Sequence, residues 1–350
     1  MVTIPTRDAY PTLRLSTSPM TASSPPIHVA TLNVRYDGQR NSPIAIPPTG
    51  AVPPAPRKPW EDKYREQAWA VRRSRLVDAL LSLGSLDLIG FQEVYASQLD
   101  DLAALLGPRW AHVGVGRDDG NKAGEYSPIF FNSDRFTLVK WKSVWLSPTP
   151  DVPGSVGWDA SQTRIATLLS LADVHGGTVH AVCTHYDDRG VKARAESSLL
   201  IRAAIRAFVD EVEGGGDPGP VLLFGDFNSP DSEDGYRNIT SFDPLPSGKQ
   251  GFTFLDAYTH LSARRPGHIA QSRPYGPKAT YTGFAAPGRE RTTRIDFVML
   301  AAADGGDSAR GGYSFSQYAV VDNWVEEGDV DGFEGRWSDH RAVRVTITKA

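Results

Sequence analysis

Runs of apolar residues divide the chain into short strands and a few helices. The segments from Ile27 to Val34 and from Leu86 to Val94 are largely apolar, which is typical of buried strands. After His340 the segment RAVRVTIT alternates apolar and polar residues, which predicts a strand with one buried face. Further strands are predicted at 128–131, 136–146, 164–172, 178–185, 220–227, 294–300 and 315–321.

Three segments repeat their apolar residues with the period of a helix. From about Glu61 the pattern turns helical, and Trp69, Leu76 and Leu80 share one face before Gly84 ends it. Helices are also predicted at 96–107 and 193–212. Strands dominate, the helices lie between them, and no linker separates two cores. We therefore expect one α/β domain over residues 27–350, with two packed sheets and helices outside them.

Two segments do not fit regular structure. Residues 1–26 are rich in Ser, Thr and Pro, and they predict a flexible N-terminal arm. Residues 41–60 are rich in proline, which removes backbone donors and breaks helices and strands, so they predict a surface insertion. The arm lacks the continuous apolar core of a secretory signal, and we expect a cytoplasmic protein.

Composition narrows the classes of partner. The formal net charge of −4 and the pI of about 6.1 argue against binding long nucleic acid through a broad basic face. No apolar run is long enough to cross a membrane. The lone Cys183 cannot form an intramolecular disulfide, so the core must hold without one. We expect a monomer whose partner is a phosphate ester of open type.

Polar residues end nearly every predicted core strand. Acidic, amide and imidazole side chains are those that a catalytic metal or a phosphate requires, and many α/β sites gather such groups at one end of a sheet. Each alone is explained by ordinary strand capping, but the whole set is hard to place at strand ends by chance. The set comprises Asn33, Glu93, His185, Asp226, Asn228, Asp296, Asp339 and His340.

The order of these motifs, N, QE, TH, GDFN, RID and SDH, resembles the endonuclease/exonuclease/phosphatase superfamily of DNase I-like enzymes. The resemblance spans roughly Ile27 to Thr348. GDFNSPDSEDGY, and TYTGF before RIDFVML, are more similar to the deadenylase-like branch than to the inositol 5-phosphatases. The resemblance implies a four-layered α/β sandwich of two mostly antiparallel sheets flanked by helices. It also implies Mg²⁺-dependent hydrolysis of a phosphate ester.

The chemistry of magnesium supports a metal site at these strand ends. Mg²⁺ is a hard cation that is usually held by one or two carboxylates together with substrate oxygens. Glu93 is suited to be the principal ligand, and Asp339 and Asn33 can complete the site directly or through water. Mn²⁺ is a possible substitute. The metal would polarise the phosphoryl oxygen and offset charge on the leaving group.

The remaining polar residues are suited to proton transfer and phosphate binding. Asp226 is the candidate to orient and deprotonate the attacking water, with Asn228 holding that water in line. His340 would transfer a proton or donate to the phosphate, and Asp296 could hold its other ring nitrogen. His185 would donate to a non-bridging oxygen.

Further phosphate donors are less sharply marked. Tyr126 in GEYSPIFF and Arg164 in TRIAT are candidates to bind substrate, as is Asn33. Structural readings stay open for Asn33 and Asn228 as turn residues and for Asp296 as a satisfied core carboxylate.

Three functions fit this set of residues. The first is a metal-dependent phosphoric ester hydrolase, with phosphodiesterase activity favoured over phosphomonoesterase activity. The second is a nuclease or deadenylase that acts on short single strands. The third is a binding protein that has kept the fold and lost catalysis, which the presence of Glu93, Asp226, Asp296 and His340 disfavours.

Overall fold

The two predicted sheets are present in the computed structural model. The structure describes residues 24–37, 66–214, 219–261, 274, 276–306, 308–326 and 334–349. The predicted insertion at 41–60 and most of the predicted arm at 1–26 lie outside the described residues.

The first sheet has six strands in the order β11-β14-β1-β2-β4-β3. Adjacent strands in this sheet pair antiparallel, except β1 and β2, which pair parallel. The strands are β1 (Ile27–Asn33), β2 (Leu88–Gln92), β3 (Trp110–Val113), β4 (Ile129–Asn132), β11 (Tyr313–Val321) and β14 (Ala342–Lys349). A separate two-stranded ribbon consists of β12 (Trp324–Val325) and β13 (Gly335–Arg336).

The second sheet also has six strands, in the order β5-β6-β7-β8-β10-β9. Only β7 and β8 pair parallel in it. The strands are β5 (Phe136–Trp145), β6 (Ile165–Asp173), β7 (Thr178–His185), β8 (Val221–Asp226), β9 (Phe254–Asp256) and β10 (Asp296–Ala301).

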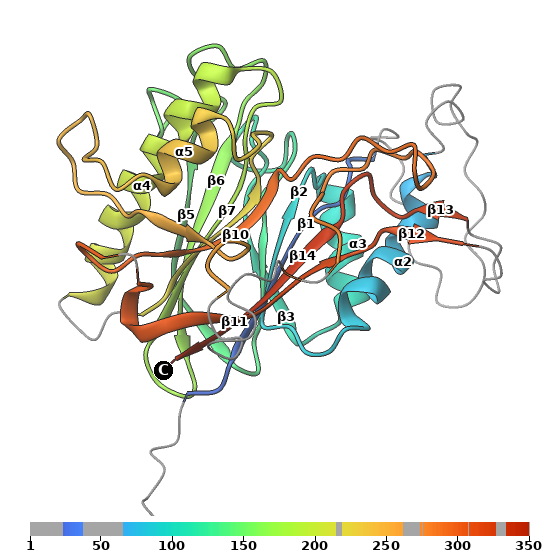
Figure 1. The fold of residues 1–350 in the computed structure, drawn as a ribbon, viewed down its shortest axis with the longest axis horizontal. Coiled ribbons are helices and arrows are strands. Elements are labelled where there is room, and N and C mark those ends of the chain that lie inside the picture. Colours follow the sequence, from blue (N-terminus) through green and yellow to red (C-terminus); the bar gives the residue numbers. More distant parts are fainter. Residues whose placement is uncertain are drawn as a thin grey trace, which may run out of the picture.

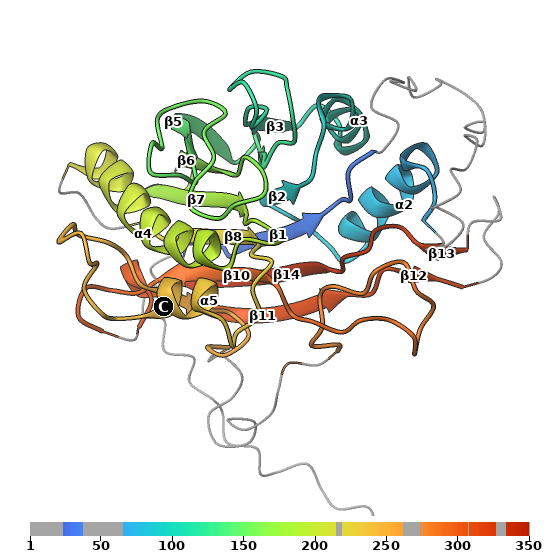
Figure 2. The same cartoon turned by 90° about the horizontal axis from the view of Figure 1, so that it is seen from above.

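The helices cover the outer faces of the two sheets, so the molecule has four layers (Figure 1 and Figure 2). α2 (Trp69–Leu81) and α3 (Ala96–Leu106) pack on the first sheet through one apolar cluster. α4 (Val191–Glu213) packs on the second sheet through another, beside α5 (Asp234–Thr240). A short 3₁₀ turn lies at Arg310–Gly312. The four-layered sandwich with two mostly antiparallel sheets agrees with the fold that the sequence predicts.

The inner faces of the sheets meet in a third apolar cluster, to which both sheets contribute. At one point the two sheets approach so closely that only glycine fits. A Cβ on Gly90 of β2 would lie 2.3 Å from the Phe224 ring of β8 and 2.9 Å from the Cys183 sulfur of β7. Such tight interdigitation fixes how the ends of the two sheets align.

Strand direction brings the polar strand ends to one edge of the sandwich. β1, β2, β7 and β8 end there, and the antiparallel strands β10 and β14 begin there. In the second sheet His185 pairs in register with Asp226, and Asp226 pairs with Asp296. In the first sheet Asn33 pairs with Gln92, the residue before Glu93. The pairing therefore places side chains from distant parts of the sequence next to one another.

Candidate functional site

Asn33 connects the two sheets at this edge. Its Nδ2 donates to Glu93 Oε1 at 2.9 Å and to Asp226 Oδ2 at 3.0 Å. Its Oδ1 accepts from the backbone N–H of Arg35 at 2.9 Å. The nitrogen of the amide, not its oxygen, therefore faces the two carboxylates. This orientation suits a residue that positions the carboxylates, and the role of Asn33 as a metal or substrate ligand stays a prediction.

Glu93 is held at both of its oxygens. Oε1 accepts from Asn33, and Oε2 accepts from the backbone N–H of Tyr36 at 3.1 Å. Burial alone raises the pKa of Glu93, but the Arg35 guanidinium and these two hydrogen bonds outweigh it. The pKa of Glu93 therefore lies below its ordinary value, and the group is an anion at neutral pH.

Backbone strain is concentrated at the same edge. Among the described residues, four non-glycine residues have positive φ, and three of them lie here: Arg35 (61°), Glu93 (61°) and Asn228 (46°). The fourth is Trp158. Such conformations cost on the order of 1–3 kcal/mol each and persist where surrounding contacts enforce them. Strain gathered in this way is a mark of functional sites.

His340 is oriented by Asp296. The ring Nδ1 lies 2.8 Å from Asp296 Oδ2, and Nε2 lies 3.6 Å from Asp226 Oδ2. Burial by itself lowers the pKa of His340, but the Asp296 and Asp226 carboxylates raise it more, to about 10. His340 is therefore an imidazolium at neutral pH, with its Nε2–H directed toward Asp226.

Asp226 lies between two histidines. Burial, with a further contribution from Asp296, raises the pKa of Asp226 to about 7. Its Oδ2 is 3.6 Å from Nε2 of both His185 and His340, which is too long for direct hydrogen bonds. Its Oδ1 accepts from the backbone N–H of Asn228 at 2.8 Å. A carboxylate with this pKa can exchange a proton near neutral pH.

Arg164 fixes the tautomer of His185. Its Nη1 lies 3.0 Å from His185 Nδ1, and a guanidinium can only donate, so Nδ1 is the acceptor. Burial, followed by the charges of Arg164 and Arg117, lowers the pKa of His185 well below its ordinary value. The neutral ring then carries its proton on Nε2. That nitrogen lies 3.0 Å from Asn228 Nδ2, which is itself a donor, so this contact is not a hydrogen bond.

Asp339 is anchored through its neighbours. The Ser338 hydroxyl donates to the backbone carbonyl of Asn33 at 2.6 Å, which ties the start of β14 to the end of β1. The Asp339 carbonyl accepts from both the backbone N–H and the hydroxyl of Thr282. Asp339 is only 7% exposed. Of the nearby carboxylates, it contributes most to raising the pKa of Arg35.

Tyr126 is the predicted site residue whose polar atom points elsewhere. Its hydroxyl donates to the backbone carbonyl of Asn121 at 2.9 Å, although the residue borders the same small cavity as Arg164 and His185. Its role in binding substrate stays a prediction.

Two residues of the site were not singled out in the sequence. Glu125 binds Arg117 Nη1 at 2.7 Å and lies 3.8 Å from His185 Nδ1. Burial and the charge of Glu93 raise the pKa of Glu125 to about 7. Arg35, two residues after Asn33, is the other. The sequence signal available was only their position, next to Tyr126 in GEYSPIFF and after the strand in TLNVRYD.

The donor set fits a hard divalent cation. Four carboxylates, those of Glu93, Asp226, Asp296 and Asp339, lie at this edge, and Asp296 Oδ1 is buried without a hydrogen-bond partner in the described structure. Ligand atoms of Asp226, Asp296 and His340 all lie within 4.8 Å of one another. Because His340 Nδ1 is hydrogen-bonded to Asp296, we interpret this trio as an oriented acid–base group. Glu93 and Asp339 remain the predicted oxygen ligands for a metal.

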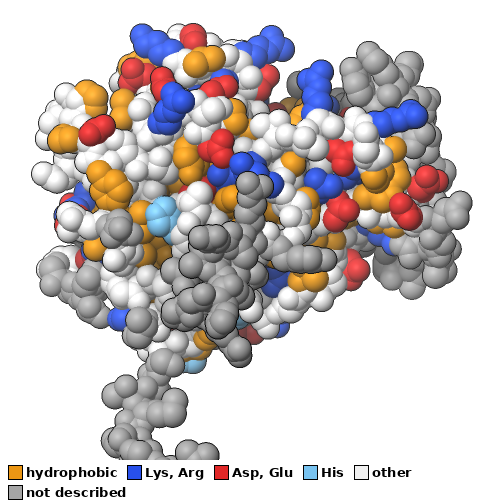
Figure 3. All heavy atoms as spheres, viewed as in Figure 1, with side chains coloured by type: hydrophobic (Ala, Val, Ile, Leu, Met, Phe, Trp, Pro, Cys, Tyr) orange, Lys and Arg blue, Asp and Glu red, His pale blue; other side chains and the backbone are white. Residues whose placement is uncertain are grey.

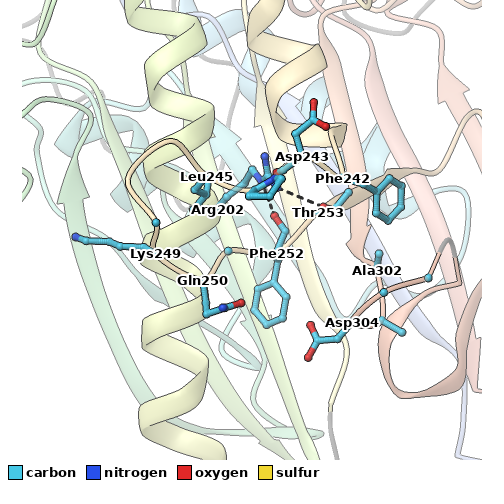
Figure 4. A pocket seen from close by; sticks show the side chains of 16 residues that line it. Arg202, Phe242, Asp243, Leu245, Lys249, Gln250, Phe252, Thr253, Ala302 and Asp304 are labelled. Atoms are coloured by element: carbon cyan, nitrogen blue, oxygen red, sulfur yellow. Dashed lines mark hydrogen bonds between the residues drawn. The ribbon is translucent and has the colours of Figure 1, made fainter.

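A separate cavity of about 920 Å³ does not belong to this site. It lies between the 242–253 loop and residues 302–306, at the opposite end of β10 from Asp296 (Figure 4). Arg202 beside it donates to the backbone carbonyls of Phe252, Asn238 and Asp243. Its donors are thus used in holding the loop.

Comparison with protein families supports a hydrolase. A model of the Endonuclease/Exonuclease/phosphatase family matches residues 30–340, so the chain belongs to this family. Members of the family are metal-dependent phosphoric ester hydrolases, and this chain is an enzyme of that class. Curated protein sequences gave no significant match. None of the helices in the described part of the chain is long and apolar enough to span a bilayer.

Solved structures extend the comparison. An endonuclease/exonuclease/phosphatase from Bacteroides vulgatus is 27% identical, with a TM-score of 0.66, over 93% of this chain and 100% of that one. The mannosyl-6-phosphatase Bt3783 of Bacteroides thetaiotaomicron is 25% identical, with a TM-score of 0.66, over 92% and 99%. The human Nocturnin catalytic domain, at 17% identity and a TM-score of 0.55 over 92% and 94%, shares the fold.

Proposed function

We propose that the protein hydrolyses a small phosphomonoester with the help of Mg²⁺, and that sugar phosphates are its substrate class. The observation that carries the proposal is the 25% identity to a mannosyl-6-phosphatase over almost the full length of both chains. The sequence alone favoured a phosphodiester. Basic and acidic side chains intermingle on the face shown in Figure 3, which gives no support for a long polyanion on that face.

In this proposal each residue of the site has a separate role in an in-line attack by water on the phosphate. Glu93 and Asp339 would hold the metal, which when bound polarises the phosphoryl oxygen and offsets charge on the leaving group. Asp226 accepts the proton of the attacking water, and Asn228 fixes the carboxylate through its backbone N–H. His340 as an imidazolium and His185 through its Nε2–H donate to phosphate oxygens.

A substrate panel tests the proposed function. With Mg²⁺ present, we expect turnover of mannose 6-phosphate, glucose 6-phosphate and p-nitrophenyl phosphate, and little turnover of bis(p-nitrophenyl) phosphate, oligo(A) or single-stranded DNA. Excess chelator should abolish turnover, and added Mg²⁺ should restore it. Faster cleavage of the diester or of the oligonucleotides than of any monoester would overturn the proposal in favour of a phosphodiesterase or nuclease.

Glu93→Gln is expected to weaken Mg²⁺ binding by roughly 10- to 100-fold or more, because a neutral amide replaces an anionic oxygen ligand. Calorimetric titration of Mg²⁺ without substrate measures this directly. Glu125→Gln serves as the matched control when both titrations are made above pH 8, where the Glu125 carboxyl, with its pKa of about 7, is also ionised. It then removes the same charge from a neighbouring buried carboxylate, and Mg²⁺ affinity is expected to change little. Equal losses in both variants would mean that Glu93 acts only through the general charge of the site.

A further inference from the structure

We propose that Arg35 binds the phosphoryl group and sets the preference of the enzyme for phosphomonoesters over phosphodiesters. This inference rests on the proposed function and adds a specificity residue to it. It starts from the backbone, because Arg35 has a φ of 61°, a conformation that an arginine adopts only when it is enforced.

Three side chains enforce this conformation. The Arg35 N–H donates to Asn33 Oδ1 at 2.9 Å. Its carbonyl accepts from Arg72 Nη2 at 3.2 Å and from Gln98 Nε2 at 3.1 Å. Arg72 is buried, and it also donates to the carbonyls of Val34 and Trp337. The end of β1 and the approach to β14 are thus tied to the same guanidinium that holds Arg35 in place.

The turn that contains Arg35 wraps around Glu93. Asn33 donates to one Glu93 oxygen, and the backbone N–H of Tyr36 donates to the other. Arg35 lies between these two residues, and its guanidinium is stacked on the Tyr36 ring with Cζ 4.5 Å from the ring centroid. Asp339 and Glu93 are the two carboxylates that contribute most to raising the pKa of Arg35. Arg35 therefore adds a positive charge beside the two proposed metal ligands.

The guanidinium of Arg35 keeps donors for a ligand. Nε contacts Glu66 at 3.3 Å, and Nη1 and Nη2 have no hydrogen-bond partner within the part of the chain that the structure describes. The side chain is 25% exposed, whereas Glu66 is 5% exposed. Glu66 thus holds the guanidinium at Nε. Nη1 and Nη2 can then bind an anion in the bidentate geometry that arginine favours for phosphate.

Charge explains why such a group would select monoesters. A phosphomonoester carries about −1.5 to −2 charges near neutral pH, whereas a phosphodiester carries only one. The edge that receives it already presents the carboxylates of Glu93, Asp226, Asp296 and Asp339. A divalent cation would offset only part of this negative charge, and further positive charge is needed to hold a phosphate dianion. A fixed guanidinium supplies that charge, and the dianion gains more from it than the monoanion does.

The test compares Arg35→Gln and Arg35→Lys with the wild-type enzyme at saturating Mg²⁺. For Arg35→Gln we expect kcat/KM for p-nitrophenyl phosphate to fall about 10- to 100-fold, the effect of losing a charge-assisted hydrogen bond, with a smaller fall for the bis(p-nitrophenyl) diester. Affinity for inorganic phosphate, measured as an inhibition constant, should fall in parallel. Arg35→Lys should retain part of both, and guanidinium ion should partly rescue Arg35→Ala.

Controls separate this role from a structural one. Arg189→Gln removes an exposed arginine and should leave every value unchanged. Equal losses on monoester and diester, or unchanged phosphate affinity with a lowered melting temperature, would show that Arg35 only stabilises the fold. If wild-type enzyme cleaves only diesters, the proposed function is wrong. The phosphate inhibition constants of the Arg35 variants would still decide whether Arg35 binds phosphate.

Discussion

His340→Ala is expected to lower kcat by roughly two to four orders of magnitude, the range for losing a proton-transfer or electrostatic group. The ring lies 2.8 Å from Asp296 Oδ2 and presents Nε2–H to the reacting edge. The flanking carboxylates of Asp296 and Asp226 raise its pKa to about 10, which favours the imidazolium form at neutral pH. Steady-state kinetics on the best substrate, together with a Mg²⁺ titration of the same variant, measure the loss.

Substitution of the neighbouring Asp339 should have a different effect on activity. Asp339→Ala is expected to raise the Mg²⁺ concentration needed for activity, so excess metal should recover part of its loss. In His340→Ala, excess Mg²⁺ should recover nothing. If metal rescues His340→Ala and not Asp339→Ala, the roles assigned to the two residues are wrong.

Asp296 acts through His340 in this scheme, which a double variant can test. Asp296→Asn alone should lower kcat less than His340→Ala, because it disturbs only the orientation and charge of the ring. In the His340→Ala background, Asp296→Asn should lower kcat no further, since two residues that act as one unit are not additive. Independent losses that add in the double variant would give Asp296 a role of its own, such as holding a metal with Asp226.

The sequence predicts much of this site because its residues occupy the ends of long, buried strands. β1, β7 and β8 are almost entirely buried, so their apolar runs are distinct, and the polar residue that ends each run is easily recognised. The direction of the strands brings the remaining residues to the same edge, because β10 runs antiparallel to β8 and β14 runs antiparallel to β1. Asp296 at the start of β10 consequently pairs with Asp226 at the end of β8.

The elements that were not predicted are short. β3 has four residues, β9 has three, and β12 and β13 have two each, which is too few to establish an alternating pattern. The seven-residue helix α5 follows a turn-rich segment after Asn228, and only two of its residues are buried. Tertiary contacts, not local periodicity, determine these elements.

Arg35 and Glu125 were missed for a different reason. The φ of 61° at Arg35 results from hydrogen bonds to Asn33, Arg72 and Gln98, which come from three separate elements. Glu125 is buried because it pairs with Arg117 eight residues earlier in a polar loop. A polar loop in the sequence has no sign of burial, so neither residue differs there from a solvated charge.

Asp226→Asn is expected to lower kcat by about three orders of magnitude, within the range for removing a general base. The carboxylate accepts at both oxygens, from the Asn228 N–H at 2.8 Å and from Asn33 Nδ2 at 3.0 Å. An amide has only one acceptor, so in either orientation its NH₂ faces one of these donors. Asn33→Ala leaves the base but removes the hydrogen bonds to Asp226, to Glu93 and from the Arg35 N–H. Excess Mg²⁺ should recover the part of its loss that comes from Glu93, and at saturating metal it should cost much less activity than Asp226→Asn. Comparable losses in the two variants would mean that Asp226 acts only by positioning.

Although Asp226→Asn lowers activity, it should make the metal-free protein more stable relative to wild type as the pH rises. Burial raises the pKa of Asp226 to about 7 in the folded protein, above its value of about 3.9 in an unfolded chain. Ionising this group therefore destabilises the metal-free protein progressively between these two values, whereas asparagine does not ionise. The melting temperature of Asp226→Asn relative to wild type, measured with chelator, should rise from pH 4 to pH 8. Comparing differences across pH removes the constant cost of the misplaced amide. A difference that stays flat over this range would show that Asp226 ionises in the fold without a penalty, as a poor candidate for the base would.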